Sequence, residues 1–164
     1  MRCHDDEVRV AVAGEFQDFG RRVSLAGHGV NRTEIVLAVV QCGAHICVAR
    51  RTELVSTSQG LWSVVMGYVE PGVQPIEQAW TEIREELGLQ PPDVWLLRSG
   101  PSLPLTSPAS AKQFLVYSYL FESAAGSELT LNWEHSEVAW VEPSRLGDAD
   151  CVPWQRDVVM ALLG

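Results

Sequence analysis

The sequence predicts an α/β fold, an α/β/α sandwich in which helices cover a mixed β-sheet. Three observations support this prediction. Short runs rich in β-branched residues recur along the chain at strand length. Two of the first runs, residues 35–40 and 46–49, are joined by residues 41–44, as in a hairpin. Two helical segments interrupt the runs, and strands interleaved with helices are typical of a sheet covered by helices.

The remaining elements follow in order. Residues 61–65 predict a strand that runs directly into a glycine-containing loop. A helix is expected over residues 74–87, because Pro75 suits a first turn and Gly88 suits a left-handed helix end. Further strands are expected at 94–98, 113–122 and 137–141, and a second helix at 154–163.

The length of 164 residues is enough for one well-buried domain and short for two. We expect this domain to span residues 33–164, after an N-terminal extension at 1–32. In the extension, residues 8–12 are a candidate strand and residues 16–25 alternate weakly. An added hairpin or an arm that contacts a partner would fit this pattern, and a homodimer is a reasonable expectation.

Composition excludes several classes of protein. The formal charge of −9 argues against a nucleic-acid surface, which needs clustered Lys and Arg. No stretch approaches the roughly 20 apolar residues that span a bilayer. Acidic residues near the N-terminus stand where a signal peptide would be apolar, so we expect a cytoplasmic protein. The four cysteines form no metal-ligand spacing, and buried or idle thiols are expected.

The predicted central helix carries three carboxylates on one stripe. Glu82, Glu85 and Glu86 are spaced by three and four residues, beside the apolar face of the helix. Each like-charge pair costs an isolated helix a few tenths of a kcal/mol, about 0.2–0.5. Negative charge in the last turn opposes the helix dipole by roughly 0.3–1 kcal/mol. A solvated acidic face tolerates these costs, whereas bound Mg²⁺ would reverse them, so spacing alone leaves both interpretations open.

Residues 67–89 resemble the signature of the Nudix hydrolases, which cleave nucleoside and other diphosphate linkages. Matching positions are Gly67, Glu82, Ile83, Glu85, Glu86, Gly88 and Leu89. Two positions depart from the pattern, because Val73 stands where the family has a glutamate and Thr81 where it has an arginine. In the family that arginine is thought to help orient the glutamates. Met66 replaces the first glycine of a usual pair, and its backbone carbonyl is the group expected to contribute.

The resemblance implies a metal-dependent mechanism. Glu82, Glu85, Glu86 and the backbone of Met66 would hold Mg²⁺ or Mn²⁺. The ion would neutralise diphosphate oxygens and activate a water for attack on phosphorus. The implied catalytic residues are Glu82 and Glu85, and Glu85 is the best candidate on the helix for taking the water's proton. The implied substrate is a small phosphorylated molecule, such as a nucleoside triphosphate, a nucleotide sugar or a dinucleotide.

Five further positions are candidates for substrate binding or proton transfer. Gly67 belongs to the signature, and Glu134 or Glu137 could replace Glu85 as the base; otherwise both are exposed acids. Arg51 suits phosphate oxygens, although a solvated charge at a strand end is equally compatible with its position. Trp62 could stack on a base, but a tryptophan entering a core strand more often packs. We expect His45 and His135 at the surface.

Two further functions remain compatible with the same fold. Val73 and Thr81 favour a nucleotide-sensing or partner-binding module that has lost efficient chemistry. An isoprenoid diphosphate isomerase would need a catalytic cysteine in a recognisable motif, and the sequence contains none.

Overall fold

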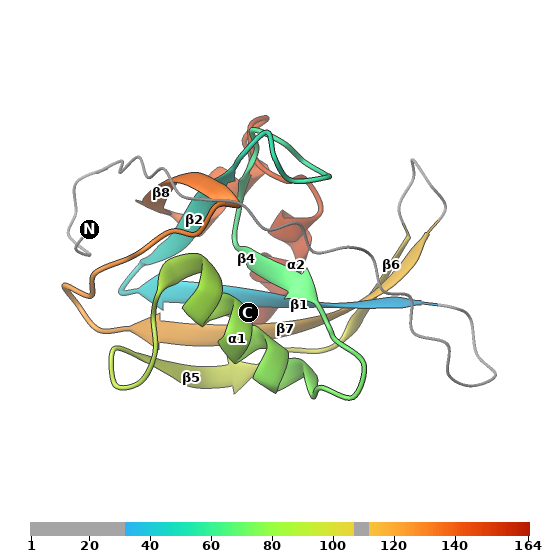
Figure 1. Ribbon diagram of the computed structural model, residues 1–164, viewed down its shortest axis with the longest axis horizontal. Coiled ribbons are helices and arrows are strands. Elements are labelled where there is room, and N and C mark those ends of the chain that lie inside the picture. Colours follow the sequence, from blue (N-terminus) through green and yellow to red (C-terminus); the bar gives the residue numbers. More distant parts are fainter. Residues whose placement is uncertain (1–31, 107–111) are drawn as a thin grey trace.

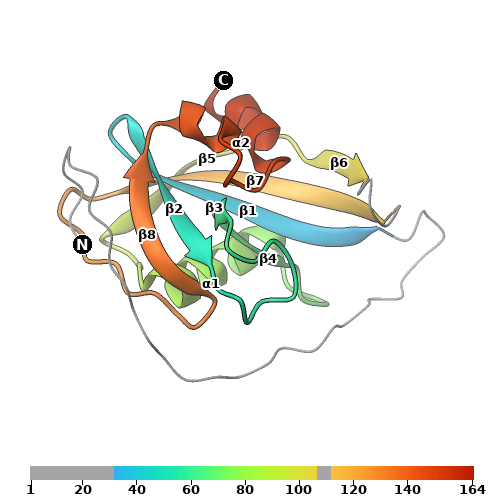
Figure 2. The same cartoon turned by 90° about the horizontal axis from the view of Figure 1, so that it is seen from above.

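The computed structural model describes residues 32–106 and 112–164 (Figure 1). Its centre is a sheet of eight strands, whose main path runs in the order β3 (Trp62–Ser63), β2 (His45–Arg51), β1 (Thr33–Cys42), β7 (Gln113–Ser123) and β5 (Val94–Ser99). Helix α1 (Pro75–Leu87) covers one face, and α2 (Gln155–Leu163) covers the other (Figures 1 and 2). The predicted α/β/α sandwich is therefore confirmed.

Strand β1 (Thr33–Cys42) is the buried centre of the sheet. It pairs in parallel with β7 (Gln113–Ser123) along its whole length. Its other edge pairs antiparallel with β2 (His45–Arg51) beside a two-residue turn, and with β4 (Val65–Tyr68) further on. The sheet is mixed, as predicted, and the hairpin of residues 35–49 is confirmed with longer strands.

The single strand predicted at residues 61–65 is wrong in its bounds. The segment forms two short strands, β3 (Trp62–Ser63) on β2 and β4 on β1. The chain changes partner at Val64, whose backbone N–H donates instead to Oε1 of Gln155 on α2, at 2.9 Å. Because β4 runs to Tyr68, Gly67 lies in a strand and not in a loop.

The other predicted elements agree with the structure to within two residues. They are β5 (Val94–Ser99), β7, β8 (His135–Val141) and α2. Two elements were not predicted. Strand β6 (Leu103–Thr106) pairs with β7, and a short 3-10 helix (Pro143–Gly147) precedes α2.

Helix α1 begins one residue later than predicted and ends at the predicted residue. Pro75 occupies its first turn, and Gly88 ends it with a φ of 70°, donating its N–H to the Arg84 carbonyl. The apolar face packs on the sheet, where Ile83 is fully buried and Trp80 meets Phe121 edge to face at 4.8 Å. This packing fixes the rotation of the helix and turns the acidic stripe towards β4 and β2.

Several expectations concern other parts of the chain. The extension expected at residues 1–32, with its candidate strand at 8–12, lies outside the described residues except for residue 32. Cys47 and Cys151 are buried free thiols, as expected, but Cys42 is disulfide-bonded, which corrects the expectation there. No helix among the described residues is long and apolar enough to cross a membrane.

Candidate functional site

The three glutamates of the α1 stripe have different environments. Glu85 is exposed, Glu82 is partly buried, and Glu86 is buried with 1% of its surface accessible. The difference follows from helix geometry, since Glu86 lies closest to the apolar face that packs on the sheet. The acidic stripe therefore extends from the solvent-exposed Glu85 to the buried Glu86.

Glu82 lies against the backbone of β4. A Cβ atom built on Gly67 would be only 1.9 Å from Oε1 of Glu82, so the carboxyl occupies the space that a side chain would fill. Burial raises the pKa of Glu82 to about 7, a hydrogen bond from Gln78 lowers it, and the charges of Glu134, Glu85 and Glu70 raise it. Gly67 is thus required by a close approach of a carboxyl group.

Glu86 is the most deeply buried acid of the site. Its Oε1 is buried and has no hydrogen-bond partner. Burial raises the pKa of Glu86 well above its usual value, and Glu82 and Glu134 raise it further, while Arg51 and the backbone of Met66 lower it. An unpartnered buried carboxylate oxygen is costly, because desolvation is not offset by a bond.

Arg51 and His135 lie on the sheet side of the same site. Arg51 is 7% exposed and donates from Nε to the Thr57 carbonyl at 3.0 Å, so it is not a solvated strand-end charge. Arg51 on β2 lies opposite His135 on β8, at the point where the register between the two strands shifts. The expectation of a surface His135 is wrong. Its ring is 1% exposed, and Nε2 lies 3.6 Å from Oε2 of Glu86.

His135 is held in its neutral form. Burial lowers the pKa of its ring to about 3, and the neighbouring Arg51 charge lowers it further. Both ring nitrogens are buried without a hydrogen-bond partner. His45, which was also predicted at the surface, is half-buried in the structure.

Glu134 joins the site from the loop before β8. It is partly buried, and its backbone carbonyl accepts a hydrogen bond from Thr52 N–H at 2.8 Å. Burial raises the pKa of Glu134, Arg51 and a hydrogen bond from Asn132 lower it, and Glu85 raises it. Its electrostatic coupling to Glu82, Glu85 and Glu86 places this loop acid beside the helix acids.

Two candidate residues lie elsewhere. Trp62 is 7% exposed and packs in the core on the α2 side, so it presents no open ring for stacking. Glu137 forms an ion pair with Arg50 at 3.0 Å. Alternate strand residues face opposite ways, and Val138 belongs to the core under α1, so Glu137 points to the other face of the sheet.

The site fits a divalent cation in its chemistry, although its ligands are not preassembled. Among residues 32–106 and 112–164, no three His, Cys, Asp or Glu side chains are arranged to hold a metal ion. The unpartnered Oε1 of Glu86 nevertheless provides an oxygen of the type that Mg²⁺ prefers. A cation would also offset the mutual repulsion of Glu82, Glu86 and Glu134.

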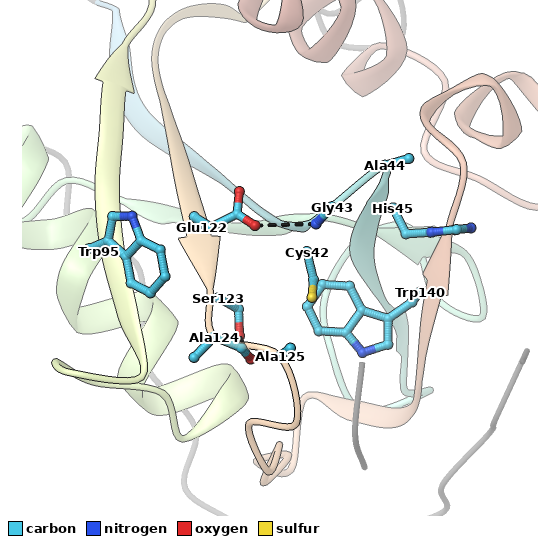
Figure 3. A pocket seen from close by; sticks show the side chains of 10 residues that line it. All are labelled: Cys42, Gly43, Ala44, His45, Trp95, Glu122, Ser123, Ala124, Ala125 and Trp140. Atoms are coloured by element: carbon cyan, nitrogen blue, oxygen red, sulfur yellow. Dashed lines mark hydrogen bonds between the residues drawn. The ribbon is translucent and has the colours of Figure 1, made fainter. Parts of the chain in front are cut away.

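A separate hollow lies at the opposite end of β2 (Figure 3). It has a volume of about 420 Å³ and is flanked by Trp95 of β5 and Trp140 of β8. Glu122 accepts a hydrogen bond there from Gly43 N–H at 3.2 Å. His45 lines this hollow, six positions before Arg51 on β2, which is roughly 20 Å along an extended strand. None of its lining residues is a predicted site residue.

Sequence reasoning missed two residues of the acidic site. Gln78 precedes Glu82 by one helical turn, and the i, i+4 spacing could have identified it as a neighbour of the carboxylate. His135 carried no comparable signal, because only the register shift between β2 and β8 places it opposite Arg51.

The sequence matches a known family of domains. The model of the NUDIX domain matches residues 31–162, which is most of the chain. The chain therefore belongs to the Nudix family. It is also 30% identical over 96 residues to nucleoside triphosphatase NudI from Escherichia fergusonii, a match that covers 56% of this chain and 68% of that protein.

Solved structures share the fold. An Ap4A hydrolase from C. elegans, solved as a binary complex, matches with a TM-score of 0.66 and 15% identity over 80% of this chain and 95% of that one. The NUDIX domain of Shewanella oneidensis NrtR, solved with ADP ribose, matches with a TM-score of 0.65 and 12% identity over 80% and 86%. At such low identity, these likenesses concern the fold alone.

Proposed function

We propose that this protein hydrolyses a diphosphate linkage in a nucleoside diphosphate derivative, with Mg²⁺ or Mn²⁺ as cofactor. The observation that carries the proposal is the buried, unpartnered carboxylate oxygen of Glu86 beside Glu82 and Glu134, in a chain of the Nudix family. Repelling carboxylates are stable in such a place when a cation joins them. Because the chain belongs to the Nudix family, we propose that this cation would bind the diphosphate group of the substrate.

Each residue has a distinct role in the proposal. Glu82, Glu85, Glu86 and the Met66 carbonyl hold the ion, which supplies Lewis acidity to the phosphate oxygens when bound. Glu85 or Glu134 accepts the proton of the attacking water, because both are more accessible than Glu86 and lie beside the helix acids. Arg51 balances part of the negative charge from the sheet side.

The relatives support a nucleotide substrate. The name of NudI describes a nucleoside triphosphatase, and the NrtR domain was solved with ADP ribose. We therefore place nucleoside triphosphates first among the candidate substrates, and nucleotide sugars and dinucleotides next.

A substrate panel tests the proposal. Purified protein is incubated with each candidate and with Mg²⁺ or Mn²⁺, and released phosphate and pyrophosphate are measured. Metal-dependent turnover of at least one nucleotide is expected, and Glu82→Gln and Glu86→Gln should abolish it while the fold persists. Undiminished turnover in both variants would contradict the assignment of these residues.

The second candidate function is a nucleotide-binding module with little or no turnover. Val73 and Thr81 favour it, because they stand where the family has a glutamate and an arginine. Thr81→Arg separates the two functions. A large gain in Mg²⁺-dependent turnover supports an enzyme with a weakened site, whereas nucleotide binding without turnover in both proteins supports the module.

A further inference from the structure

Gln78 is a buried residue whose side-chain amide forms hydrogen bonds through both its nitrogen and its oxygen. It lies on α1 one turn before Glu82 and is 6% exposed. Its Nε2 donates to Oε1 of Glu82 at 2.8 Å, and its Oε1 accepts from the backbone N–H of Glu70 at 3.2 Å. These partners fix the orientation of the amide, because a backbone N–H only donates and a carboxylate only accepts.

The contact confines the Glu82 carboxyl from one side. Gly67 leaves room for the same carboxyl against β4, since a Cβ there would overlap it. Glu82 therefore has two fixed neighbours, the backbone of β4 and the amide of Gln78. The Glu70 contact also ties the segment between β4 and α1 to the same helix face.

The neighbouring helix positions offer no comparable contact. Thr81 is uncharged, and Glu85, one turn after Glu82, repels it. A neutral amide can hold a carboxylate without competing with a cation for its charge. It also leaves the second oxygen of Glu82 free of this contact, since only Oε1 is bonded to Gln78.

We propose that Gln78 is a positioning residue of this site, which holds the Glu82 carboxyl against β4 in the orientation that binds the metal ion. The inference rests on the proposed function, because it assigns to Gln78 the placement of one of the proposed ligands. Gln78 itself contacts neither metal nor substrate. Its loss should act through metal affinity, and groups that orient metal ligands typically contribute about 10–100-fold to that affinity.

The test compares Gln78→Met with the wild type. Methionine keeps the size of the side chain and removes both hydrogen bonds. The measurements are Mn²⁺ affinity by electron paramagnetic resonance or calorimetry, with and without a non-hydrolysable nucleotide, and kcat and KM at saturating metal. Gln90→Met, at an exposed position beyond the helix, is the matched control. Gln78→Asn is the second variant; it keeps the amide but is one methylene too short to reach both partners.

Gln78→Met and Gln78→Asn are expected to weaken Mn²⁺ binding about tenfold or more, while kcat and KM at saturating metal stay within about threefold of the wild type. Gln90→Met should behave as the wild type does. Unchanged Mn²⁺ affinity in a folded Gln78 variant would overturn the positioning role while leaving the proposed function intact. Absence of Mn²⁺ binding by the wild type, even beside nucleotide, would overturn both.

Discussion

Replacing Glu82 by glutamine should stabilise the metal-free protein at alkaline pH. The pKa of Glu82 rises from 4.5 to about 7, first through burial and then through the nearby acids. The unfolded chain releases this proton near pH 4.5, but the folded protein keeps it until about pH 7. The contribution of Glu82 to the free energy of unfolding is therefore fully present below pH 4.5 and is lost as the pH rises through 7.

The magnitude follows from the two pKa values. Each pKa unit corresponds to about 1.4 kcal/mol, so complete ionisation of folded Glu82 costs about 3 kcal/mol. Most of this loss falls between pH 5 and 8, where it amounts to about 2–3 kcal/mol. Glutamine has the same shape, can still accept the bond from Gln78 and does not titrate. The stability of Glu82→Gln relative to the wild type should therefore increase by that amount over this range.

Urea denaturation at pH 5, 6, 7 and 8, without divalent metal, measures the difference. His135 acts in the opposite direction, because its pKa is lowered to about 3 and its contribution to stability increases as the pH rises towards 6.5. This effect is present in both proteins and cancels in the comparison. Glu128→Gln, at an exposed position, serves as the control.

Magnesium provides the second half of the test. At pH 8, Mg²⁺ at 100 times its Kd for the wild type should stabilise the wild type by about 2.7 kcal/mol and should have little effect on the stability of Glu82→Gln. Parallel stability curves of the two proteins from pH 5 to 8 would refute the reasoning about the buried carboxyl. Equal stabilisation of both by magnesium would refute the assignment of Glu82 as a ligand.

Three further substitutions test the geometry of the site. Gly67→Ala should displace the Glu82 carboxyl and weaken Mn²⁺ binding at least tenfold. The stability cost should be only about 1 kcal/mol, because the overlapping atoms are the end of a flexible side chain. Gly147→Ala is the control, and unchanged Mn²⁺ binding by Gly67→Ala would contradict the overlap. Trp62→Ala should lower the free energy of unfolding by about 3–5 kcal/mol in urea denaturation, as for a core residue; a raised KM with unchanged stability would instead indicate a stacking role. Glu137→Gln should leave kcat within about twofold of the wild type, since Glu137 pairs with Arg50, and a hundredfold loss of kcat would make Glu137 a candidate base again.

Local sequence signals predicted α1 and its acidic stripe well. Pro75 and Gly88 mark the ends of the helix by backbone chemistry that does not depend on the rest of the fold, and both ends agree with the structure. The spacing of the glutamates likewise fixes their common side on any helix. The strand at residues 61–65 was harder, because its division between β2 and β1 depends on Gln155, 91 positions further along the chain.

The sequence alone determined that this chain is an α/β protein with three carboxylates on one turn-spaced stripe of a helix, since periodicity and end signals are local properties. The tertiary structure decided which of those carboxylates is buried and what surrounds it. Glu86 enters the core, Glu82 rests against Gly67 and Gln78, and Arg51 and His135 reach the site from the sheet. Burial and charge environment arise when distant segments pack together, and no pattern within one segment contains them.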